Sequence, residues 1–190
     1  MGAPAFRFDA DEHIYTDLDG RQIPNITTML KTTGWIDERW YTEESCLRGI
    51  AVHSLTTDVD LGALDVESCV TKYRGYLLAH VAATKVLRPT WTEIEVPRVH
   101  EGFRFGGRPD RVGLVCNLHT IADIKSGAKH KAHPIQTALQ AILVATPARL
   151  PAHQWQRMNI YIKATGKFCV EIHRNRRDFD EAMEIIKACC

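Results

Sequence analysis

One stretch of the sequence decides the fold: residues 108–127 read RPDRVGLVCNLHTIADIKSG. Its two segments Arg108–Val115 and His119–Lys125 have the composition of β-strands. Each segment carries one aspartate, Asp110 and Asp123, and carboxylates on adjacent strands can share a hard divalent cation. Mg²⁺ prefers oxygen ligands and usually takes one or two carboxylates together with waters and phosphate. The stretch therefore predicts a pair of strands that can hold a metal ion.

The second strand carries a further chemical group, because Asp123 is followed two residues later by Lys125. Side chains alternate along a strand, so these two residues share a face while the side chain of Ile124 points into the other layer. The backbone carbonyl of Ile124 is then available beside them. A lysine near a metal-bound water can orient or deprotonate it and offset charge on a phosphate. Asp-x-Lys also occurs on solvated polar faces, and the motif alone leaves both interpretations open.

Around this stretch, the hydrophobic pattern predicts alternating helices and strands. Helices are expected over Asp37–Asp58, Asp65–Leu87 and Pro134–Thr146, with a short one capped by Asn25 or Thr27 and a last one opening at Asp178 as N-cap. Further strands are expected over Phe6–Asp9, Glu12–Thr16, Trp91–Val99, Phe103–Phe105, Trp155–Lys163 and Lys167–His173. In the helix over Asp37–Asp58, the candidate apolar positions are Trp40, Leu47, Ile50 and Leu55.

This order of elements predicts an α/β or α+β fold with a central mixed β-sheet flanked by helices. The connection from His119–Lys125 through the following helix to Trp155–Lys163 is expected to be a βαβ unit. The length of 190 residues is typical of one domain. Within it, residues 1–88 would form an N-terminal hairpin and helices, and residues 89–190 the sheet.

The net charge of +1 conceals an uneven distribution of charge along the chain. Residues 1–70 hold five bases and thirteen acids, a net of −8, whereas residues 71–190 hold nineteen bases and ten acids, a net of +9. Such asymmetry indicates either a polyanionic partner or two oppositely charged regions that pack on one another. We expect the basic residues to line a cleft and the acidic ones to face away from it.

Other features limit the class of protein. No run of about 18 apolar residues is present, which argues against a membrane span. The first residues lack a basic region followed by an apolar run, so no secretory signal is expected. The six cysteines contain no CxxC pair and are interpreted as reduced thiols. The expected location is the cytoplasm.

Three further groups support the metal-site interpretation. His53 follows Gly49 by one helical turn, where the glycine would permit close approach of another element, and neutral imidazole is a good metal ligand. Gln136 and Gln140 share one face of a helix and can hold a phosphate or a lysine. The strand over Trp91–Val99 alternates, which puts Glu93 and Glu95 on one face and could add a carboxylate. A helix-face histidine and surface glutamines are the plain alternatives.

Together these motifs resemble the PD-(D/E)xK nuclease superfamily, and more closely its RecB-like branch of phage and recombination exonucleases. The ordered motifs are Gly49–His53, Glu93 or Glu95, Gly107–Asp110, Asp123–Gly127 and Gln136. The opening segment from His13 to Thr27 is also similar to the N-terminal hairpin and helix of phage-type members. The resemblance covers nearly the whole chain and implies a restriction-endonuclease-like core.

The resemblance also implies an activity and a role for each residue. It implies an Mg²⁺- or Mn²⁺-dependent deoxyribonuclease with one or two ions, most simply an exonuclease of phage or recombination and repair type. The implied metal ligands are His53, Asp110, Asp123 and the Ile124 backbone carbonyl, with Glu95 as a further candidate. Lys125 would assist the attacking water, and Gln136 would orient the phosphate or the lysine. Gln140 departs from the family, which often has tyrosine at that position.

Double- or single-stranded DNA is the expected partner, together with a phage recombination or single-strand-binding protein. Backbone phosphates can be neutralised without reading bases. The candidate contacts are Arg104, Arg108, Arg111, Ser126, Lys129, Lys131, Gln140, Arg174, Arg176 and Arg177. Some relatives bind an iron–sulfur cluster through four cysteines. Here Cys189 and Cys190 are adjacent and lie twenty residues after Cys169, spacings that argue against such a cluster.

Two other classes of protein remain open at this stage. A catalytically silent nuclease fold would bind nucleic acid without cutting it. An interaction or inhibitory factor would use the acidic N-terminal part as a docking surface or a DNA mimic.

Overall fold

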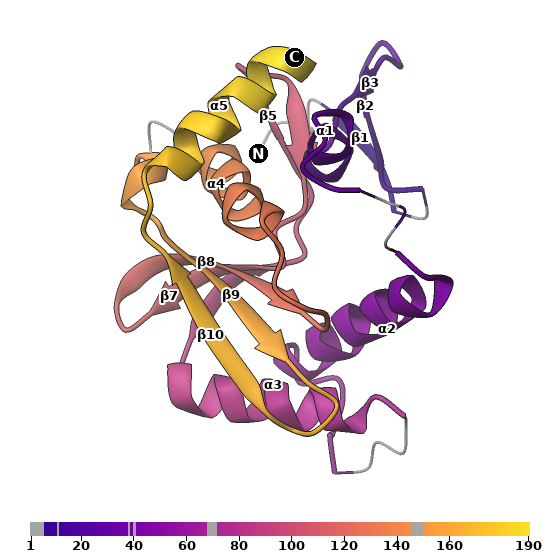
Figure 1. Ribbon diagram of the computed structural model, residues 1–190, viewed down its shortest axis with the longest axis vertical. Coiled ribbons are helices and arrows are strands. Elements are labelled where there is room, and N and C mark those ends of the chain that lie inside the picture. The colour runs from indigo at the N-terminus through magenta and orange to yellow at the C-terminus, as the bar shows by residue number, and fades with distance from the viewer. Residues whose placement is uncertain (1–5, 11, 38, 40, 68–71, 146–149) are drawn as a thin grey trace.

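A five-stranded mixed sheet forms the centre of the computed structural model, which describes residues 6–10, 12–37, 39, 41–67, 72–145 and 150–190 (Figure 1). The strand order is β10-β9-β8-β7-β4. The strands are β4 Thr90–Ile94, β7 Arg111–Val115, β8 Leu118–Lys125, β9 Gln156–Ile162 and β10 Phe168–His173. Only the β8–β9 pair in this sheet is parallel. The predicted fold class, a mixed sheet flanked by helices, is confirmed.

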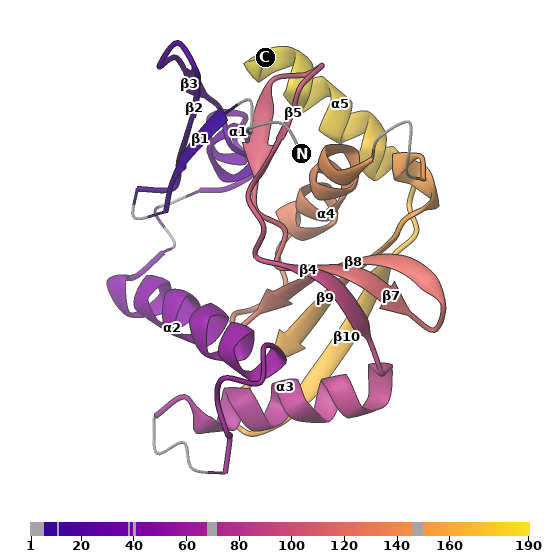
Figure 2. The same cartoon turned by 180° about the vertical axis from the view of Figure 1, so that it is seen from behind.

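Helices cover both faces of this sheet (Figures 1 and 2). Helix α3, Arg74–Leu87, packs on one face, and α4, Ala132–Val144, covers the other with α5, Arg177–Cys189, beside it. The alternation along β8 supplies both contacts: Ile124 packs with residues of α3, while Ile121 packs with residues of α4. Because α4 joins the parallel strands β8 and β9, the expected βαβ unit is confirmed.

The N-terminal part forms a small separate sheet followed by a short helix. Strands β1 Phe6–Asp9, β2 Ile14–Asp17 and β3 Gln22–Ile23 are antiparallel neighbours, as the predicted hairpin implies. Helix α1, Ile26–Thr32, begins after Asn25, whose side chain accepts a hydrogen bond of 2.9 Å from the Thr28 amide. This contact satisfies one of the free amides of the first turn and identifies Asn25, not Thr27, as the N-cap.

Helix α2, Glu43–Asp60, starts later than the predicted Asp37, after a capping box formed by Thr42 and Ser45. Leu47 and Ile50 are 56% and 70% exposed, so their expected role as apolar contact positions is wrong. Leu55 is half-buried and packs against the cluster of Val66 and Leu77, as expected. Trp40 lies outside the described residues. Helix α2 lies beside the sheet rather than under it, so only part of its surface is covered (Figure 1).

Several predicted element boundaries differ from those in the structure. The described residues from Asp65 to Tyr73 form turns rather than the first turns of α3, and residues 68–71 lie outside the described part. The predicted strand Trp91–Val99 is divided into β4 and β5, Arg98–His100, of which β5 pairs with β6, Phe105–Gly107, in a sheet of their own. A short 3₁₀ helix spans Ala152–Gln154. No helix in the described part of the chain is long and apolar enough to cross a membrane.

Asp178 was expected to cap the last helix from outside, and this is wrong. The N-cap of α5 is Arg176, and Asp178 lies inside the first turn. Its carboxylate is buried and accepts a hydrogen bond of 2.8 Å from Arg157 of β9. The acid is therefore used in a buried ion pair between the sheet and α5.

Candidate active site

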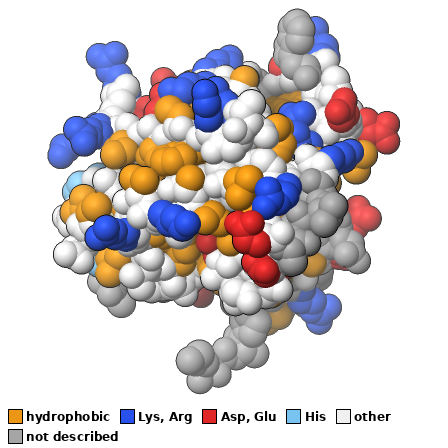
Figure 3. All heavy atoms as spheres, turned by 90° about the horizontal axis from the view of Figure 1, so that it is seen from below, with side chains coloured by type: hydrophobic (Ala, Val, Ile, Leu, Met, Phe, Trp, Pro, Cys, Tyr) orange, Lys and Arg blue, Asp and Glu red, His pale blue; other side chains and the backbone are white. Residues whose placement is uncertain are grey.

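A cavity of about 800 Å³ opens between α1 and α2 and reaches the ends of β7 and β8. Its charged lining residues are Glu12, Asp58, Glu95, Asp110, Asp123, Lys31, Arg108 and Lys125. With five acids and three bases, this lining contradicts the expectation that basic residues line the cleft and acidic ones face away. Lys and Arg side chains are also spread over the face seen in Figure 3, with Asp and Glu among them. The cavity therefore favours a cation before it favours a polyanion.

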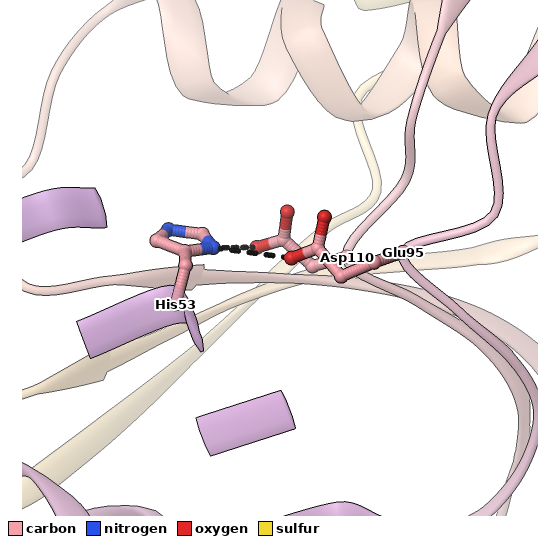
Figure 4. A group of neighbouring side chains, drawn as sticks. All are labelled: His53, Glu95 and Asp110. Atoms are coloured by element: carbon pink, nitrogen blue, oxygen red, sulfur yellow. Dashed lines mark ion pairs between the residues drawn. The ribbon is translucent and has the colours of Figure 1, made fainter. Parts of the chain in front are cut away.

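Three side chains that are distant in sequence converge in this cavity: His53 of α2, Glu95 just after β4 and Asp110 just before β7 (Figure 4). The imidazole of His53, from α2, points at the carboxylates of Glu95 and Asp110. Its Nδ1 atom lies 3.3 Å from Asp110 Oδ2 and 3.5 Å from Glu95 Oε1. The three ligand atoms all lie within 4.8 Å of one another. Among the described residues, this is the only group of at least three His, Cys, Asp or Glu side chains close enough to hold a metal ion.

Glu95 reaches this group because the backbone of β4 departs from regular alternation. The pairing register of β4 shifts between Trp91 and Glu93, and Glu95 itself has a φ of 53°. A bulge redirects the following side chains, and a left-handed glutamate is a strained conformation held by its surroundings. The Glu95 amide donates a 3.1 Å hydrogen bond to the Asp110 carbonyl. Of the two candidate carboxylates, Glu95 joins the group, whereas Glu93 binds Arg98 at 2.6 Å.

The protonation of this group reflects its burial. Burial raises the pKa of Asp110 well above its usual range, although His53 lowers it, and the Asp123 and Glu95 charges raise it further. Burial by itself would lower the pKa of His53, but Asp110 and Glu95 outweigh it and raise that pKa. Glu95 also binds Arg108 at 2.9 Å, whereas burial leaves the charged form of Asp110 disfavoured.

Asp123 lies beside this group, and both of its carboxylate oxygens are hydrogen-bonded. Gln136 and Gln140 each donate to Oδ1 at 3.1 Å, which confirms that the two glutamines share a face of α4. Lys125 contacts Oδ2 at 2.6 Å, and Asn159 donates to it at 2.9 Å. A carboxylate offers about four lone-pair sites, so these four donors occupy its accepting capacity. Its expected role as a metal ligand stays a prediction.

Lys125 is held as a charged group. Burial would lower its pKa, but the nearby carboxylates of Asp123 and Asp110 outweigh burial and raise it. Its Nζ also donates to Gln136 Oε1 at 3.0 Å. The carboxyl of Asp123 has its pKa lowered, because Lys125, His53 and Gln140 outweigh the effect of burial. The pair therefore exists as ammonium and carboxylate at neutral pH.

Sequence reasoning missed Asn159, which is fully buried in the middle of β9. Its Nδ2 donates to Asp123, and its Oδ1 lies 2.6 Å from His173 Nε2. The available signal was a single amide in the otherwise apolar run Met158–Ile162, since buried polar groups in such a strand require partners. The Ile124 amide was also missed: it donates to Asp110 Oδ2 at 2.6 Å. The proposed role of the Ile124 carbonyl stays a prediction.

The candidate nucleic-acid contacts divide by their surroundings. Arg111 was expected to contact phosphate, and this is wrong, because its side chain is fully buried and binds Asp60 at 2.6 Å. Arg108 lines the cavity and binds Glu95 at 2.9 Å. Gln140 lines it too but is buried against Asp123. The others do not line the cavity and stay predictions: Arg104, Ser126, Lys129, Lys131, Arg174, Arg176 and Arg177.

Gly49 also differs from its expected role. A Cβ atom at this position would meet no heavy atom within 4 Å, so the missing side chain does not serve close packing of a neighbouring element. Gly49 instead forms part of the cavity lining.

Comparison with known proteins gives a likeness at the level of the fold. No protein-family model and no curated protein matches the sequence. The crystal structure of a candidate exonuclease from Eubacterium rectale is similar over 85% of this chain and 69% of its own, with 12% sequence identity and a TM-score of 0.45. A likeness of this size does not assign an activity, so the function has to be inferred from the site.

Proposed function

We propose that this chain is a metal-dependent nuclease that hydrolyses phosphodiester bonds. The observation that carries the proposal is the convergence of His53, Glu95 and Asp110 in a cavity that also contains the Asp123–Lys125 ion pair. One wall of the cavity can thus bind a cation, and the adjoining wall carries a fixed positive charge.

The donor set fits a divalent metal ion. Carboxylate oxygens suit Mg²⁺ and Mn²⁺, and an imidazole nitrogen is compatible with Mn²⁺ and other transition ions. Burial raises the pKa of Asp110 and so disfavours its charged form, and a bound cation would stabilise that form. His53, Glu95 and Asp110 would hold the ion. Such an ion polarises a phosphoryl oxygen and lowers the pKa of a bound water.

The protein's own groups supply positioning and charge. Lys125 keeps its proton, so it can stabilise negative charge on a phosphate or orient a water, but it is unsuited to act as a base. Asp123 and Gln136 hold its ammonium group at 2.6 and 3.0 Å. A charged group that is already fixed in place needs little reorganisation during the reaction, which is the basis of electrostatic preorganisation.

DNA is the proposed substrate and removal of nucleotides from an end the proposed mode of cleavage. Both rest on the order of the motifs, which resembles that of RecB-like exonucleases. The alternative is a catalytically silent nuclease fold that binds nucleic acid. The excess of acids in the cavity bears on this alternative, because phosphate would approach such a lining poorly without a cation.

The experiment is a cleavage assay on end-labelled linear, circular and single-stranded DNA, with an RNA substrate in parallel. Each is incubated with Mg²⁺, with Mn²⁺ or with chelator. Lys125→Ala is the test variant, and Lys187→Ala is its control, since Lys187 is exposed on α5 and pairs with Glu184 outside the cavity. We expect metal-dependent loss of label from linear DNA, retained in Lys187→Ala and abolished in Lys125→Ala.

Each other outcome has a definite meaning. Cleavage of circular DNA would replace the exonuclease proposal by an endonuclease. Binding of all substrates in Ca²⁺ or Mn²⁺ without cleavage would favour the silent nuclease fold. Cleavage by Lys125→Ala at the wild-type rate would contradict the role proposed for the lysine.

A further inference from the structure

One buried carboxylate, that of Asp60, links three elements around His53, Glu95 and Asp110, which we call the metal-binding group. Asp60 is the last residue of α2, seven positions after His53 on the same helix. Its side chain is 4% exposed. Oδ1 lies 2.8 Å from Nε2 of His80 on α3, and Oδ2 accepts a 2.6 Å hydrogen bond from Nε of Arg111 on β7. Two helices and a strand thus meet at a single side chain.

Arg111 extends this link to the other two members of the group. Its guanidinium is fully buried, and Nη1 donates to the Asp110 carbonyl at 2.8 Å. The same Nη1 lies 4.0 Å from Glu95 Oε1. Asp60 and Arg111 therefore connect the helix that carries His53 to the backbone of Asp110 and to the side chain of Glu95.

Stability alone does not explain these buried charges. Replacing a buried ion pair by apolar residues is often neutral or stabilising, because desolvation offsets the attraction of the charges. In the described part of the chain, Nη2 of Arg111 and Nδ1 of His80 are buried without a hydrogen-bond partner. Such groups reduce stability. A geometric role therefore accounts for the network better than a stabilising one.

We propose that Asp60 and Arg111 are positioning residues for the metal-binding group. Asp60 sets the rotation and height of α2 against β7, and so the place of the His53 imidazole relative to the two carboxylates. The Arg111 guanidinium holds the Asp110 backbone and offsets part of the repulsion between Asp110 and Glu95. This inference rests on the proposed function, because it takes His53, Glu95 and Asp110 to be metal ligands. Groups that orient metal ligands in this way typically change metal affinity by about 10- to 100-fold when they are replaced.

The test measures Mn²⁺ affinity of the full-length protein by calorimetry and by the electron paramagnetic resonance signal of free Mn²⁺. The test variants are Asp60→Asn, which keeps the size of the side chain, and Arg111→Lys, which keeps the charge but loses the planar fork. The matched control is Asp178→Asn, because Asp178 also forms a buried pair with an arginine, Arg157, at 2.8 Å. Neither residue of that pair lines the cavity. Unfolding is followed without metal for all variants.

We expect Asp60→Asn and Arg111→Lys to lower Mn²⁺ affinity by roughly 10- to 100-fold. Asp178→Asn should lose stability without metal and keep the wild-type affinity. Equal affinities for Asp60→Asn and wild type would overturn the proposal, and so would an equal loss in Asp178→Asn. Failure of both test variants to unfold cooperatively would overturn it too, since the network would then serve the fold as a whole.

His53→Ala separates this proposal from the proposed function. If wild type binds no Mn²⁺, or binds it no better than His53→Ala, the metal site itself is wrong. If wild type binds Mn²⁺, His53→Ala does not, and Asp60→Asn binds as wild type, only the positioning role is wrong.

Discussion

The ion pair between Lys125 and Asp123 allows a quantitative prediction for Lys125→Met. The Nζ–Oδ2 distance is 2.6 Å, and the side chains are 18% and 1% exposed. Removing one partner of a buried pair leaves an uncompensated charge and costs about 3–5 kcal/mol. Three amide donors, from Gln136, Gln140 and Asn159, still hold the Asp123 carboxylate, so the loss should lie near the lower end, about 3 kcal/mol.

Lys187→Met is the matched control for this prediction. Lys187 contacts Glu184 at 2.7 Å, nearly the same distance, but the two side chains are 65% and 69% exposed. A surface pair contributes about 0–1 kcal/mol, so this variant should unfold almost as wild type does. The comparison therefore holds the contact distance constant and changes the burial.

Both variants are unfolded in urea without metal at neutral pH, followed by tryptophan fluorescence and far-ultraviolet circular dichroism. At roughly 2–4 °C per kcal/mol for a chain of this size, Lys125→Met should also melt about 6–12 °C below wild type. A free energy of unfolding for Lys125→Met equal to that of Lys187→Met would refute the reasoning. The double variant Asp123→Asn with Lys125→Met should lose less than the sum of the single losses, because the two groups interact directly.

Three further predictions concern pH, packing and metal. The pKa of His133 is lowered from 6.5 to about 4, first by burial and then by Lys125, so the unfolded chain binds more protons between these pH values. The free energy of unfolding should therefore decrease as the pH falls through this window, and it should decrease less in His133→Gln. An equal pH dependence of the free energy of unfolding in wild type and in His133→Gln would contradict this. Gly113→Ala should prevent or severely weaken folding, seen as loss of a cooperative melt, because its Cβ would lie 2.2 Å from the Thr90 carbonyl oxygen, where the backbone cannot easily move. Mn²⁺ at 100 times its dissociation constant should stabilise the protein by about 2.7 kcal/mol in thermal melts. Asp110→Asn should abolish this increase, and an equal increase in that variant would exclude Asp110 as a ligand.

Local periodicity was sufficient for the parts of the site that lie within one element. The two-residue repeat of a strand predicted that Asp123 and Lys125 share a face, and they are in contact. The helical repeat predicted the same for Gln136 and Gln140, and both donate to one oxygen of Asp123. These relations depend only on backbone geometry, which short stretches of sequence specify.

Periodicity was insufficient where the backbone departs from regular geometry. The alternation of a regular strand predicted that Glu93 and Glu95 share one face. The register shift in β4 and the left-handed backbone at Glu95 give the two side chains different directions. Pro97 was a sign that no regular strand runs through Trp91–Val99, because a proline cannot donate to a strand ladder, but no glycine marks the left-handed position at Glu95 itself. The pairing of β4 with β7 and the hydrogen bond to Asp110 maintain it.

By itself, the sequence determined the type of fold and the paired carboxylate and lysine, because strand and helix periods and side-chain chemistry are local properties. The tertiary structure alone decided which charged side chains are buried against partners inside the protein. Arg111 appeared to be one more phosphate-binding arginine, yet it is fully buried against Asp60, 51 positions earlier in the chain. The acidic and basic regions likewise meet in one cavity instead of separating. A charge is buried or exposed according to partners that are distant in sequence, and only the folded chain brings those partners together.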